Sequence, residues 1–404
     1  MVIPPSGSSS DPSSIIVVPA ILLDRMSLYS LSHLPQLIYR MRGVATTTRG
    51  LEEVAISEIT EIVGKNARKA HPGLVTFDCT ELDLFMLNFL ARSLHRIIML
   101  LIEESFSDAE DIYRKVKEVD FSGYIDENQS FAVRAKRCGT HDFTSMDVAS
   151  WVGQAVIDSF MEATGKRLTV NLDEPDVIVR VEVRDEMFWL GIDTTGEVSL
   201  AKRGYRCFRH PAPLKPTIAY SLVRLSGWHF EESLIDPVCG TGTIPIEAGR
   251  YACDLPNTRD VSIYHLPFFM QENFLDIRRE HQVMNRKLDV FGSDINEKFI
   301  QGAKKCARLA GVDVRFMRAD AREIPLDYDV IIANPPYGIR MGSPRKLERF
   351  YEAFATNLRR YEGSWRCAVI FTARPSSFVR HMGEPERELD VLYGNLPSKV
   401  LIYR

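Results

Sequence analysis

The sequence lacks the cysteine patterns that stabilise secreted proteins or hold structural metals. Its 404 residues include 7 cysteines, an odd number, and no two of them form a CxxC pair. No cluster of histidine, cysteine and acidic residues has the spacing of metal ligands either. We therefore expect neither a disulfide framework nor a metal requirement, and a reducing cytoplasm is the expected location.

Long hydrophobic segments are also absent. The longest apolar run, Ile15–Leu23, contains Pro19 and is too short to span a bilayer. No lysine or arginine precedes this run, so it lacks the charged start of a signal peptide, and no membrane partner is expected. Residues 1–41 are rich in serine and proline, which predicts a flexible tail or a start site placed too far upstream.

The chain has no excess of positive charge. Lys plus Arg number 50 and Asp plus Glu number 54, which gives a formal net charge of -4. A uniformly basic protein is excluded, so any contact with a nucleic acid must use local basic patches. Hydrophobic residues make up 45% and charged residues 26%, as in soluble globular proteins, and the length predicts about two to three domains.

Regular patterns begin after residue 41 and predict two small α/β units. The first, residues 42–106, has the expected order β-α-β-α-β of a split-βαβ, ferredoxin-like domain. The second, residues 107–205, combines helices and strands, the last two strands joined by a tight turn. The expected elements are Val44–Thr47, Leu51–Val63, Leu74–Asp78, Thr80–Leu90 and Ile97–Glu103, then Asp108–Val116, Ser130–Lys136, Asp147–Thr164, Arg167–Asn171, Asp176–Arg184 and Met187–Asp193.

Residues 206–216 contain three prolines and predict an extended linker. From residue 217 to residue 404, strands and helices alternate, which predicts a parallel, doubly wound sheet with an antiparallel hairpin at its edge. The expected strands are Leu234–Asp236, Asp289–Asp294, Val314–Arg318, Val330–Asn334, Cys367–Thr372, Glu388–Tyr393 and Lys399–Tyr403. The expected helices are Thr217–Leu225, Thr243–Tyr251, Glu297–Ala310 and Leu347–Arg360.

A glycine-rich turn follows the first of these strands, in the segment DPVCGTGT at residues 236–243. Gly240 and Gly242 allow a tight turn and a close approach to a ligand, and the start of the next helix favours a negatively charged group. A dinucleotide fingerprint would need another glycine at position 245, where the chain has Pro245. Pro245 therefore disfavours a dinucleotide as the ligand of this turn.

Acidic residues stand at the ends of three successive strands, as Asp236, Asp294 and Asp320. Asp294 can accept both hydroxyls of a ribose, and Asp320 could accept from an adenine amino group. Three carboxylates disfavour a pyrophosphate and suit a zwitterionic nucleoside such as S-adenosylmethionine, whose ammonium and ribose are donors. The alternative is that Asp236 and Asp294 are only helix caps or turn residues.

The segment Asn334-Pro335-Pro336-Tyr337 follows a strongly apolar strand and carries the clearest signal in the chain. The two prolines fix the backbone of the turn, which holds nearby groups still. The side-chain oxygen of Asn334 and the carbonyl of Pro335 can both accept from one exocyclic NH₂, and Tyr337 offers an aromatic face for stacking. Asparagine is no base at neutral pH, so this chemistry would rest on positioning, with a proton lost afterwards.

Together, DPVCGTGT and NPPYG resemble the class I S-adenosylmethionine-dependent methyltransferases, with a Rossmann-like fold, that modify exocyclic amino groups of bases. Residues 107–205, with FAVRAKR at 131–137 and RGYR at 203–206, resemble a THUMP domain, an RNA-binding module. The whole order of domains is similar to that of the THUMP-containing tRNA guanine-N2 methyltransferases. The group that forms N2-methylguanosine at position 6 of the tRNA acceptor stem matches best, over residues 42–404.

This resemblance implies S-adenosylmethionine as cofactor, tRNA as partner and a role for each matching position. The residues implied at the cofactor are Ala212, Pro213, Leu214, Asp236, Gly240, Thr241, Gly242, Thr243, Asp294, Asp320, Ala321 and Asn334. Those implied at the target base are Asn334, Pro335, Pro336 and Tyr337. Residues 1–40 have no counterpart in the family pattern, and the stretch 253–288 is longer than a minimal methyltransferase needs, which favours a structural insertion over a lid or an RNA contact.

Three basic clusters are candidate RNA contacts. Each could neutralise backbone phosphates, although a single cluster is more often a solvated surface. Because a base in an A-form stem cannot be reached in place, the target would have to be flipped out. The clusters are Arg134, Lys136 and Arg137; Lys202, Arg203 and Arg206; and Arg340, Arg345 and Lys346.

Three functions stay open on these residues. The favoured one is N2-methylation of a tRNA guanosine by a monomeric enzyme. The alternatives are an adenine-N6 methyltransferase acting on RNA or DNA, and a non-catalytic RNA-binding protein. The presence of Asp236, Asp294 and Asn334 argues against the non-catalytic alternative.

Overall fold

The computed structural model describes residues 41–208, 211, 213–257, 260–267, 269, 271–338 and 344–404, without the side chains of residues 271–275. Residues 1–40 of the predicted tail, Ala212 and Arg340 lie outside these described residues, whereas Met41, the last residue assigned to the tail, begins the first strand. Within the same ranges, every helix is too short or too polar to cross a membrane. No group of three or more His, Cys, Asp or Glu side chains in this part could hold a metal ion, and the cysteines are free thiols.

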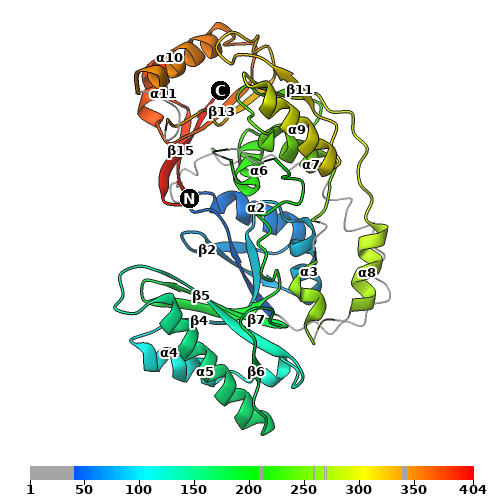
Figure 1. Ribbon diagram of the computed structural model, residues 1–404, viewed down its shortest axis with the longest axis vertical. Helices are drawn as coiled ribbons and strands as arrows, with labels where there is room; N and C mark the ends of the chain where they lie inside the picture. Colours follow the sequence, from blue (N-terminus) through cyan, green and yellow to red (C-terminus); the bar gives the residue numbers. More distant parts are fainter. Residues whose placement is uncertain are drawn as a thin grey trace, which may run out of the picture. The chain divides into compact units, whose positions relative to one another are not determined.

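The N-terminal half forms one eight-stranded sheet, in the order β2-β3-β1-β4-β8-β7-β5-β6 (Figure 1). Strand β4 (Arg96–Ser105) pairs antiparallel with β8 (Met187–Asp193). The predicted units 42–106 and 107–205 therefore share a single sheet, which β4 and β8 join.

The first unit contains a strand that the sequence pattern missed. Its elements are β1 (Met41–Thr46), α2 (Glu52–Val63), β2 (Ala67–His71), β3 (Leu74–Cys79), α3 (Glu81–Leu90) and β4. β2 pairs with β3 at the edge of the sheet, and its residues ARKAH are half-buried or exposed. Because an edge strand needs no apolar alternation, its polar residues gave no strand signal. With β2 included, the unit has the β-α-β-β-α-β order of a ferredoxin-like fold.

The second unit places two helices side by side on one face of its strands (Figure 1). Its elements are α4 (Ala109–Lys117), β5 (Ser130–Cys138), α5 (Ser145–Thr164), β6 (Thr169–Val170), β7 (Val177–Arg184) and β8. Helix α5 starts at a capping box, in which the Thr144 hydroxyl accepts from the Asp147 N–H and the Asp147 carboxylate accepts from the Thr144 N–H. β6 is shorter than predicted and pairs with β5 through only two residues.

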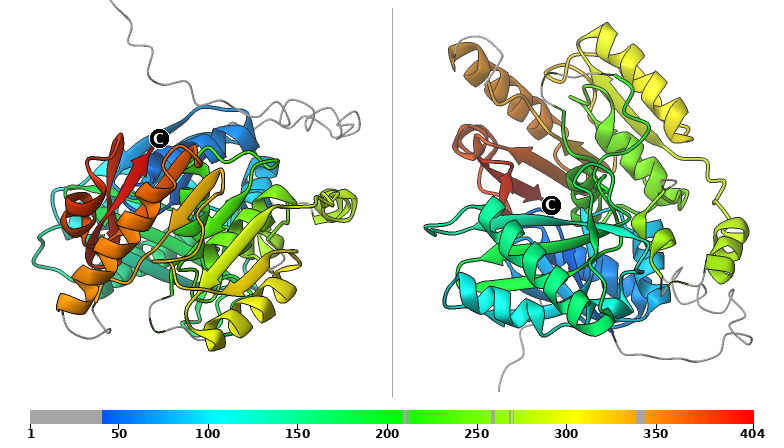
Figure 2. Two further views of the ribbon diagram at one scale, coloured as in Figure 1. Left: turned by 90° about the horizontal axis from the view of Figure 1, so that it is seen from above. Right: turned by 60° about the horizontal axis from the view of Figure 1, so that its bottom comes forward.

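The C-terminal half forms a seven-stranded sheet in the order β11-β10-β9-β12-β13-β15-β14. Five strands are parallel, and β15 runs antiparallel to β13 and forms a hairpin with β14, drawn red in Figure 2. The fold predicted for this half, a doubly wound sheet with an edge hairpin, is confirmed. The strands are β9 (Leu234–Asp236), β10 (Val290–Asp294), β11 (Arg315–Arg318), β12 (Val330–Ala333), β13 (Cys367–Thr372), β14 (Arg387–Tyr393) and β15 (Leu396–Tyr403).

Helices cover both faces of this sheet (Figure 1). Leu234 of β9 packs with α6 (Pro216–Leu225) and α7 (Thr243–Ala252), whereas its neighbour Ile235 packs with α10 (Pro344–Arg360). Helix α9 (Glu297–Ala310) packs against α7, and α11 (Pro375–Met382), which was not predicted, packs against α10. Because the parallel strands all end at one edge, the turns that follow them gather there.

The long stretch between α7 and β10 packs against the N-terminal half. It contains a short 3-10 helix (Ser262–His265) and α8 (Gln271–Glu280). Ile263 is buried in the hydrophobic core of the N-terminal half, and its N–H donates to the Thr194 carbonyl at 2.9 Å. The Asn257 N–H likewise donates to the Phe89 carbonyl at 2.7 Å. These contacts support the interpretation of residues 253–288 as a structural insertion.

Candidate active site

The turn after β9 buries a carboxylate and contains two glycines in the left-handed region. Asp236 is only 2% exposed, and its Oδ1 accepts from the Val238 N–H at 3.0 Å. Burial raises the pKa of Asp236 well above its usual range, and the negative charge of Asp294 raises it further. Gly240 has φ 53° and Gly242 has φ 78°. The turn thus holds a carboxyl group that a nearby positive charge would stabilise in its ionised form.

Gly242 is required for packing as well as for its backbone angle. A Cβ atom at this position would lie 2.7 Å from the ring of Phe316 on β11. Since the ring is only 8% exposed and packed in the core, it has little room to move. The close approach of turn to ring therefore explains why a glycine stands here.

Asp294, at the end of β10, connects two turns. Its Oδ2 accepts from the Gly240 N–H at 3.0 Å, and its Oδ1 accepts from the Asn296 N–H at 2.8 Å. Helix α7 is capped by Gly242 and helix α9 by Asn296. Asp236 and Asp294 are therefore not helix caps, although both stabilise turns. A carboxylate oxygen has a second lone pair, so Asp294 can still accept from two hydroxyls of a ligand.

Asp320, after β11, has a partner that the sequence pattern did not indicate. The Arg322 guanidinium donates through Nε to both carboxylate oxygens, at 2.9 and 3.1 Å. This hydrogen bonding by Arg322 lowers the pKa of Asp320. An adenine amino group would therefore have to share the carboxylate with Arg322. The neighbouring Ala321 is buried, and its carbonyl accepts from Asn357 Nδ2 at 3.0 Å.

The turn after β12 is held by groups from two other elements. The Tyr351 hydroxyl, from α10, donates to the Pro336 carbonyl at 3.1 Å. Arg374, beyond the end of β13, donates through Nε to the Tyr337 carbonyl at 3.0 Å. We did not predict these two residues, but β13 pairs with β12, so its carboxyl end was a signal for such a neighbour.

Inside this turn, the Tyr337 hydroxyl donates to the Oδ1 of Asn334. The Tyr337 ring packs edge-on against Phe371, with ring centroids 6.4 Å apart. Burial raises the pKa of Tyr337 far above its usual value, so the phenol stays a neutral donor. The amide oxygen of Asn334 keeps a second lone pair and can accept from a base, whereas the predicted stacking on Tyr337 would need part of its ring to be uncovered.

The linker contacts the edge hairpin of the same sheet. The Pro213 carbonyl accepts from the hydroxyl of Tyr393 on β14. Leu214 is 5% exposed and packs in the core with α6. Thr241 and Thr243, in the glycine turn, are also buried. The described residues of both turns and of the linker thus meet at one end of the C-terminal sheet.

The predicted basic clusters differ in how free their charges are. Arg134 donates through Nε to Glu197 at 2.7 Å, and Arg137 donates through Nη1 to the Gly139 carbonyl at 3.0 Å. Lys136 and Lys202 are exposed, and Arg206 is half-buried. Arg345 and Lys346 are exposed in the first turn of α10. The five cations other than Arg134 and Arg137 therefore remain available to contact phosphates, Arg206 less so because it is half-buried.

The burial and pairing of Arg203 disfavour the predicted RNA contact. Its side chain is buried, with Nε 3.4 Å from Glu247 Oε1 and Nη2 donating to the Arg92 carbonyl at 2.9 Å. The hydroxyl of Tyr205 donates to the same Glu247 oxygen at 2.8 Å. Arg203, just before the linker, therefore connects the N-terminal half to α7 through a buried ion pair.

We expect Arg203→Met to destabilise the protein by about 3 kcal/mol, because the buried Glu247 carboxylate loses the positive charge of Arg203 and keeps the Tyr205 hydroxyl as a donor. Thermal unfolding of the purified variant measures this effect. The matched surface variant Lys202→Met should unfold like the unaltered protein. An unchanged unfolding midpoint together with weaker RNA binding would return Arg203 to the list of RNA contacts.

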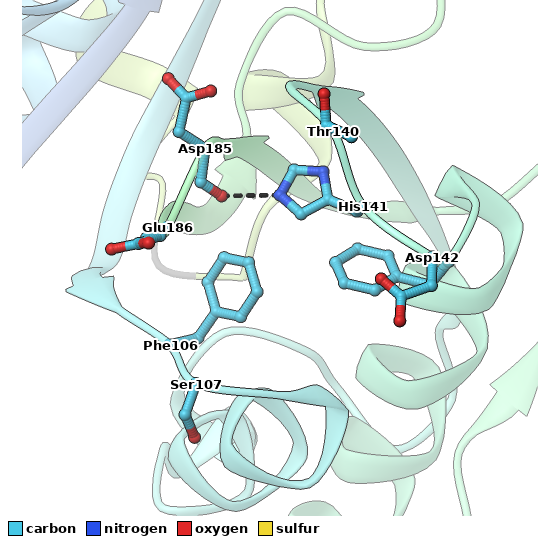
Figure 3. A pocket seen from close by; sticks show the side chains of 8 residues that line it. Phe106, Ser107, Thr140, His141, Asp142, Asp185 and Glu186 are labelled. Atoms are coloured by element: carbon cyan, nitrogen blue, oxygen red, sulfur yellow. Dashed lines mark hydrogen bonds between the residues drawn. The ribbon is translucent and has the colours of Figure 1, made fainter.

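A separate cavity lies in the N-terminal half (Figure 3). The His141 ring faces the backbone of Asp185, and its Nε2 donates to the Asp185 carbonyl at 2.7 Å. The cavity is lined by Phe106, Ser107, Thr140, His141, Asp142, Phe143, Asp185 and Glu186. It contains none of the residues of the two motif turns, so it is not part of the candidate active site.

Three protein-family models match consecutive parts of the chain. The model described as RlmL ferredoxin-like domain matches residues 43–98, the THUMP domain model matches residues 106–193, and the model described as RMKL-like, methyltransferase domain matches residues 203–392. The last match contains both motif turns. It therefore connects the geometry at the end of the sheet with methyl transfer.

The chain is also similar to characterised proteins over most of its length. It is 39% identical over 370 residues to a tRNA (guanine(6)-N2)-methyltransferase of Archaeoglobus fulgidus, covering 90% of this chain and 92% of that protein. A protein of the same description from Methanocaldococcus jannaschii is 39% identical over 373 residues, covering 88% and 97%. The crystal structure of SMU.472, complexed with SAH, has the same fold, with a TM-score of 0.79 at 23% identity over 90% of this chain and 98% of that one.

Proposed function

The chain belongs to the family of THUMP-containing tRNA (guanine-N2) methyltransferases, and from this membership we propose that it transfers a methyl group from S-adenosylmethionine to the N2 amino group of a tRNA guanosine. The proposal rests on one observation above all. The turn with buried Asp236 and the Asn334-Pro335-Pro336-Tyr337 turn follow adjacent strands, β9 and β12. By analogy with the relatives, we propose the guanosine at position 6 of the tRNA, in the acceptor stem.

The residues at the ends of β9 and β10 fit S-adenosylmethionine. A buried carboxyl with a raised pKa, Asp236, suits the ammonium of the methionine end, and Asp294 has lone pairs left for the ribose hydroxyls. Gly240 and Gly242 leave the space that side chains would fill. When bound, the cofactor supplies an electrophilic sulfonium methyl group.

At the target, the chain would orient a nucleobase rather than deprotonate it. Asn334 Oδ1 and the Pro335 carbonyl would accept from the exocyclic NH₂ and so fix its lone pair toward the methyl group. Positive charge would develop on this nitrogen as the new N–C bond forms and the S–C bond to the methyl group breaks. The same two oxygens would stabilise that charge until the nitrogen loses its extra proton to water. The Tyr337 hydroxyl, already bonded to Asn334, keeps the amide in one orientation.

We propose that five of the predicted cations contact the tRNA backbone. They are Lys136, Lys202, Arg206, Arg345 and Lys346. The tRNA would be bound and oriented by the two N-terminal units, residues 42–106 and 107–205. A linker, residues 206–216, would connect them to the domain that catalyses the methyl transfer, residues 217–404. We further propose that the protein acts in the cytoplasm as a monomer and without a metal ion. Sedimentation with and without tRNA, and activity in the presence of a chelator, test the last two points.

Methylation of an unmodified tRNA transcript tests the main proposal. Nucleoside mass spectrometry after incubation with S-adenosylmethionine should detect N2-methylguanosine, and cleavage mapping should locate it at position 6. A transcript with adenosine at position 6 is the matched substrate control and should stay unmethylated there. Methyladenosine without methylguanosine would instead support the adenine-N6 alternative.

The raised pKa of Asp236 predicts a pH dependence of cofactor binding. Since the ammonium of S-adenosylmethionine favours the ionised carboxyl, affinity should fall as the pH drops through this raised pKa. The folded-state pKa lies above the unfolded one, so ionisation of Asp236 lowers stability as the pH rises from the unfolded pKa through the folded one. Asp236→Asn should therefore raise the unfolding midpoint at neutral pH, weaken cofactor binding by about tenfold and remove its pH dependence.

Calorimetric titrations across the pH range and thermal unfolding of both proteins measure these effects. A wild-type affinity that does not change with pH would contradict the assignment of Asp236 to the ammonium.

A further inference from the structure

Positive charges without acidic partners gather where the linker meets the hairpin β14–β15. Lys215 lies just before α6, with its Nζ 5.9 Å from the centroid of the Tyr393 ring on β14. The positive charge of Lys136, from β5, acts on Lys215, and that of Arg206 acts on the Tyr393 hydroxyl. Among the described residues, none of these three cations forms an ion pair, and Glu182, which lies opposite Lys136 in the sheet, is paired with Arg184.

The side chain of His95 lies in the same positive field. His95 is half-buried between the N-terminal half and α6, where its Nε2 lies 3.1 Å from the Thr217 hydroxyl. Burial is the main cause that lowers the pKa of His95, and together with the charges of Lys215, Lys136, Arg203 and Arg96 it brings this pKa to about 3. Arg203 and Arg96 are paired with Glu247 and Asp193. Lys136 and Lys215 are therefore the uncompensated sources of this field.

Such an arrangement is unfavourable unless an anion completes it. Lys215 is half-buried, and burial lowers its pKa, with the charge of Lys136 as the second cause. The chain as a whole is acidic, with a net charge of -4, so a group of cations without acids is a local exception. A half-buried cation with a second, exposed cation beside it attracts a negatively charged group.

We propose that Lys136, Lys215 and Arg206 form a phosphate-binding site that holds the RNA backbone where the linker joins the N-terminal sheet to the methyltransferase domain. This inference rests on the proposed function, because it takes tRNA as the substrate. Lys215, which no sequence pattern singled out, is the centre of the site.

Packed rings connect this site to the target-base turn. The Tyr393 ring contacts Phe371 at 5.9 Å, and Phe371 contacts Tyr337 at 6.4 Å between centroids. The Tyr393 hydroxyl also donates to the Pro213 carbonyl, two residues before Lys215. A phosphate held at Lys215 therefore has a fixed position relative to Asn334 and Tyr337, which suits the extrusion of one base into that turn.

Binding of tRNA over a series of salt concentrations tests the site in the full-length protein. Lys215→Met should weaken binding about tenfold and make the slope of log affinity against log salt less steep by about 1. The matched control is Lys399→Met in the same hairpin, where the lysine is 2.6 Å from Glu388 and no slope change is expected. Lys215→Arg keeps the charge and should restore the wild-type slope.

Stability without RNA gives a second readout that a purely structural lysine would not produce. Lys215→Met should raise the unfolding midpoint, because it removes a half-buried charge, although it weakens tRNA binding. Inorganic phosphate should raise the wild-type midpoint more than that of the variant, relative to chloride at equal ionic strength. An unchanged salt slope in a folded Lys215→Met protein would overturn the proposal.

The test of the phosphate site can fail or succeed independently of the test of the proposed reaction. If the wild-type protein binds tRNA with a slope that depends on Lys215 but forms no methylguanosine, the proposed reaction fails and the phosphate site stands. If methylguanosine forms and the slope is the same in Lys215→Met, the phosphate site fails alone.

Discussion

Replacing Asn334 by alanine is expected to lower the methylation rate by about 10²–10³-fold while the affinity for S-adenosylmethionine stays nearly unchanged. The reason lies in the turn after β12, where Asn334 immediately precedes the two prolines and offers its amide oxygen as an acceptor. Alanine removes the oxygen that would orient the exocyclic nitrogen. It does not touch Asp236 or Asp294, which we assign to the cofactor. Single-turnover methylation and calorimetric titration of the same preparation measure the two quantities.

Graded substitutions make this experiment sharper. Asn334→Asp retains acceptor oxygens at the same distance from the backbone, so its rate should lie between those of the wild type and Asn334→Ala. Both variants also remove or alter the acceptor of the Tyr337 hydroxyl, so thermal unfolding serves as the control for local damage. If Asn334→Ala methylates tRNA at the wild-type rate, positioning by this amide is not the source of catalysis.

The motif turns were predictable because their chemistry is local in the sequence. Glycines 240 and 242 and the two prolines restrict the backbone within a few residues, and Asp236 and Asp294 end strands with a clear apolar pattern. The structure has strand β9 and helix α9 with the predicted bounds. Since parallel strands end at one edge, the gathering of these turns followed from the predicted topology alone.

Contacts between side chains were not predictable in the same way. The pairing of Asp320 with Arg322 and the bond from Tyr337 to Asn334 depend on rotamers, which local patterns do not encode. The burial of Arg203 depends on Glu247, which is 44 residues away in the chain. β2 was missed because its residues are polar, and the joining of two units by β4 and β8 is a long-range pairing.

Asp294→Ala is expected to weaken the binding of S-adenosylmethionine by about a hundredfold, which makes it the largest expected effect on the cofactor. Two costs add in this variant. The ribose hydroxyls lose their carboxylate acceptor, and the N–H groups of Gly240 and Asn296 lose the oxygens to which they now donate. The glycine turn then has no partner from β10 and should become less well ordered.

Asp289→Ala is the matched control, because Asp289 immediately precedes the same strand at its opposite end and pairs with Arg315 on the surface. It should bind the cofactor like the wild type, whereas Asp294→Asn, which keeps one acceptor oxygen, should lose less affinity than Asp294→Ala. When the cofactor concentration is raised enough to saturate Asp294→Ala, its methylation rate should reach that of the wild type, since the base-orienting turn is untouched. A rate that stays low at saturation, with normal cofactor affinity, would mean that Asp294 acts on the reacting groups and not on the ribose.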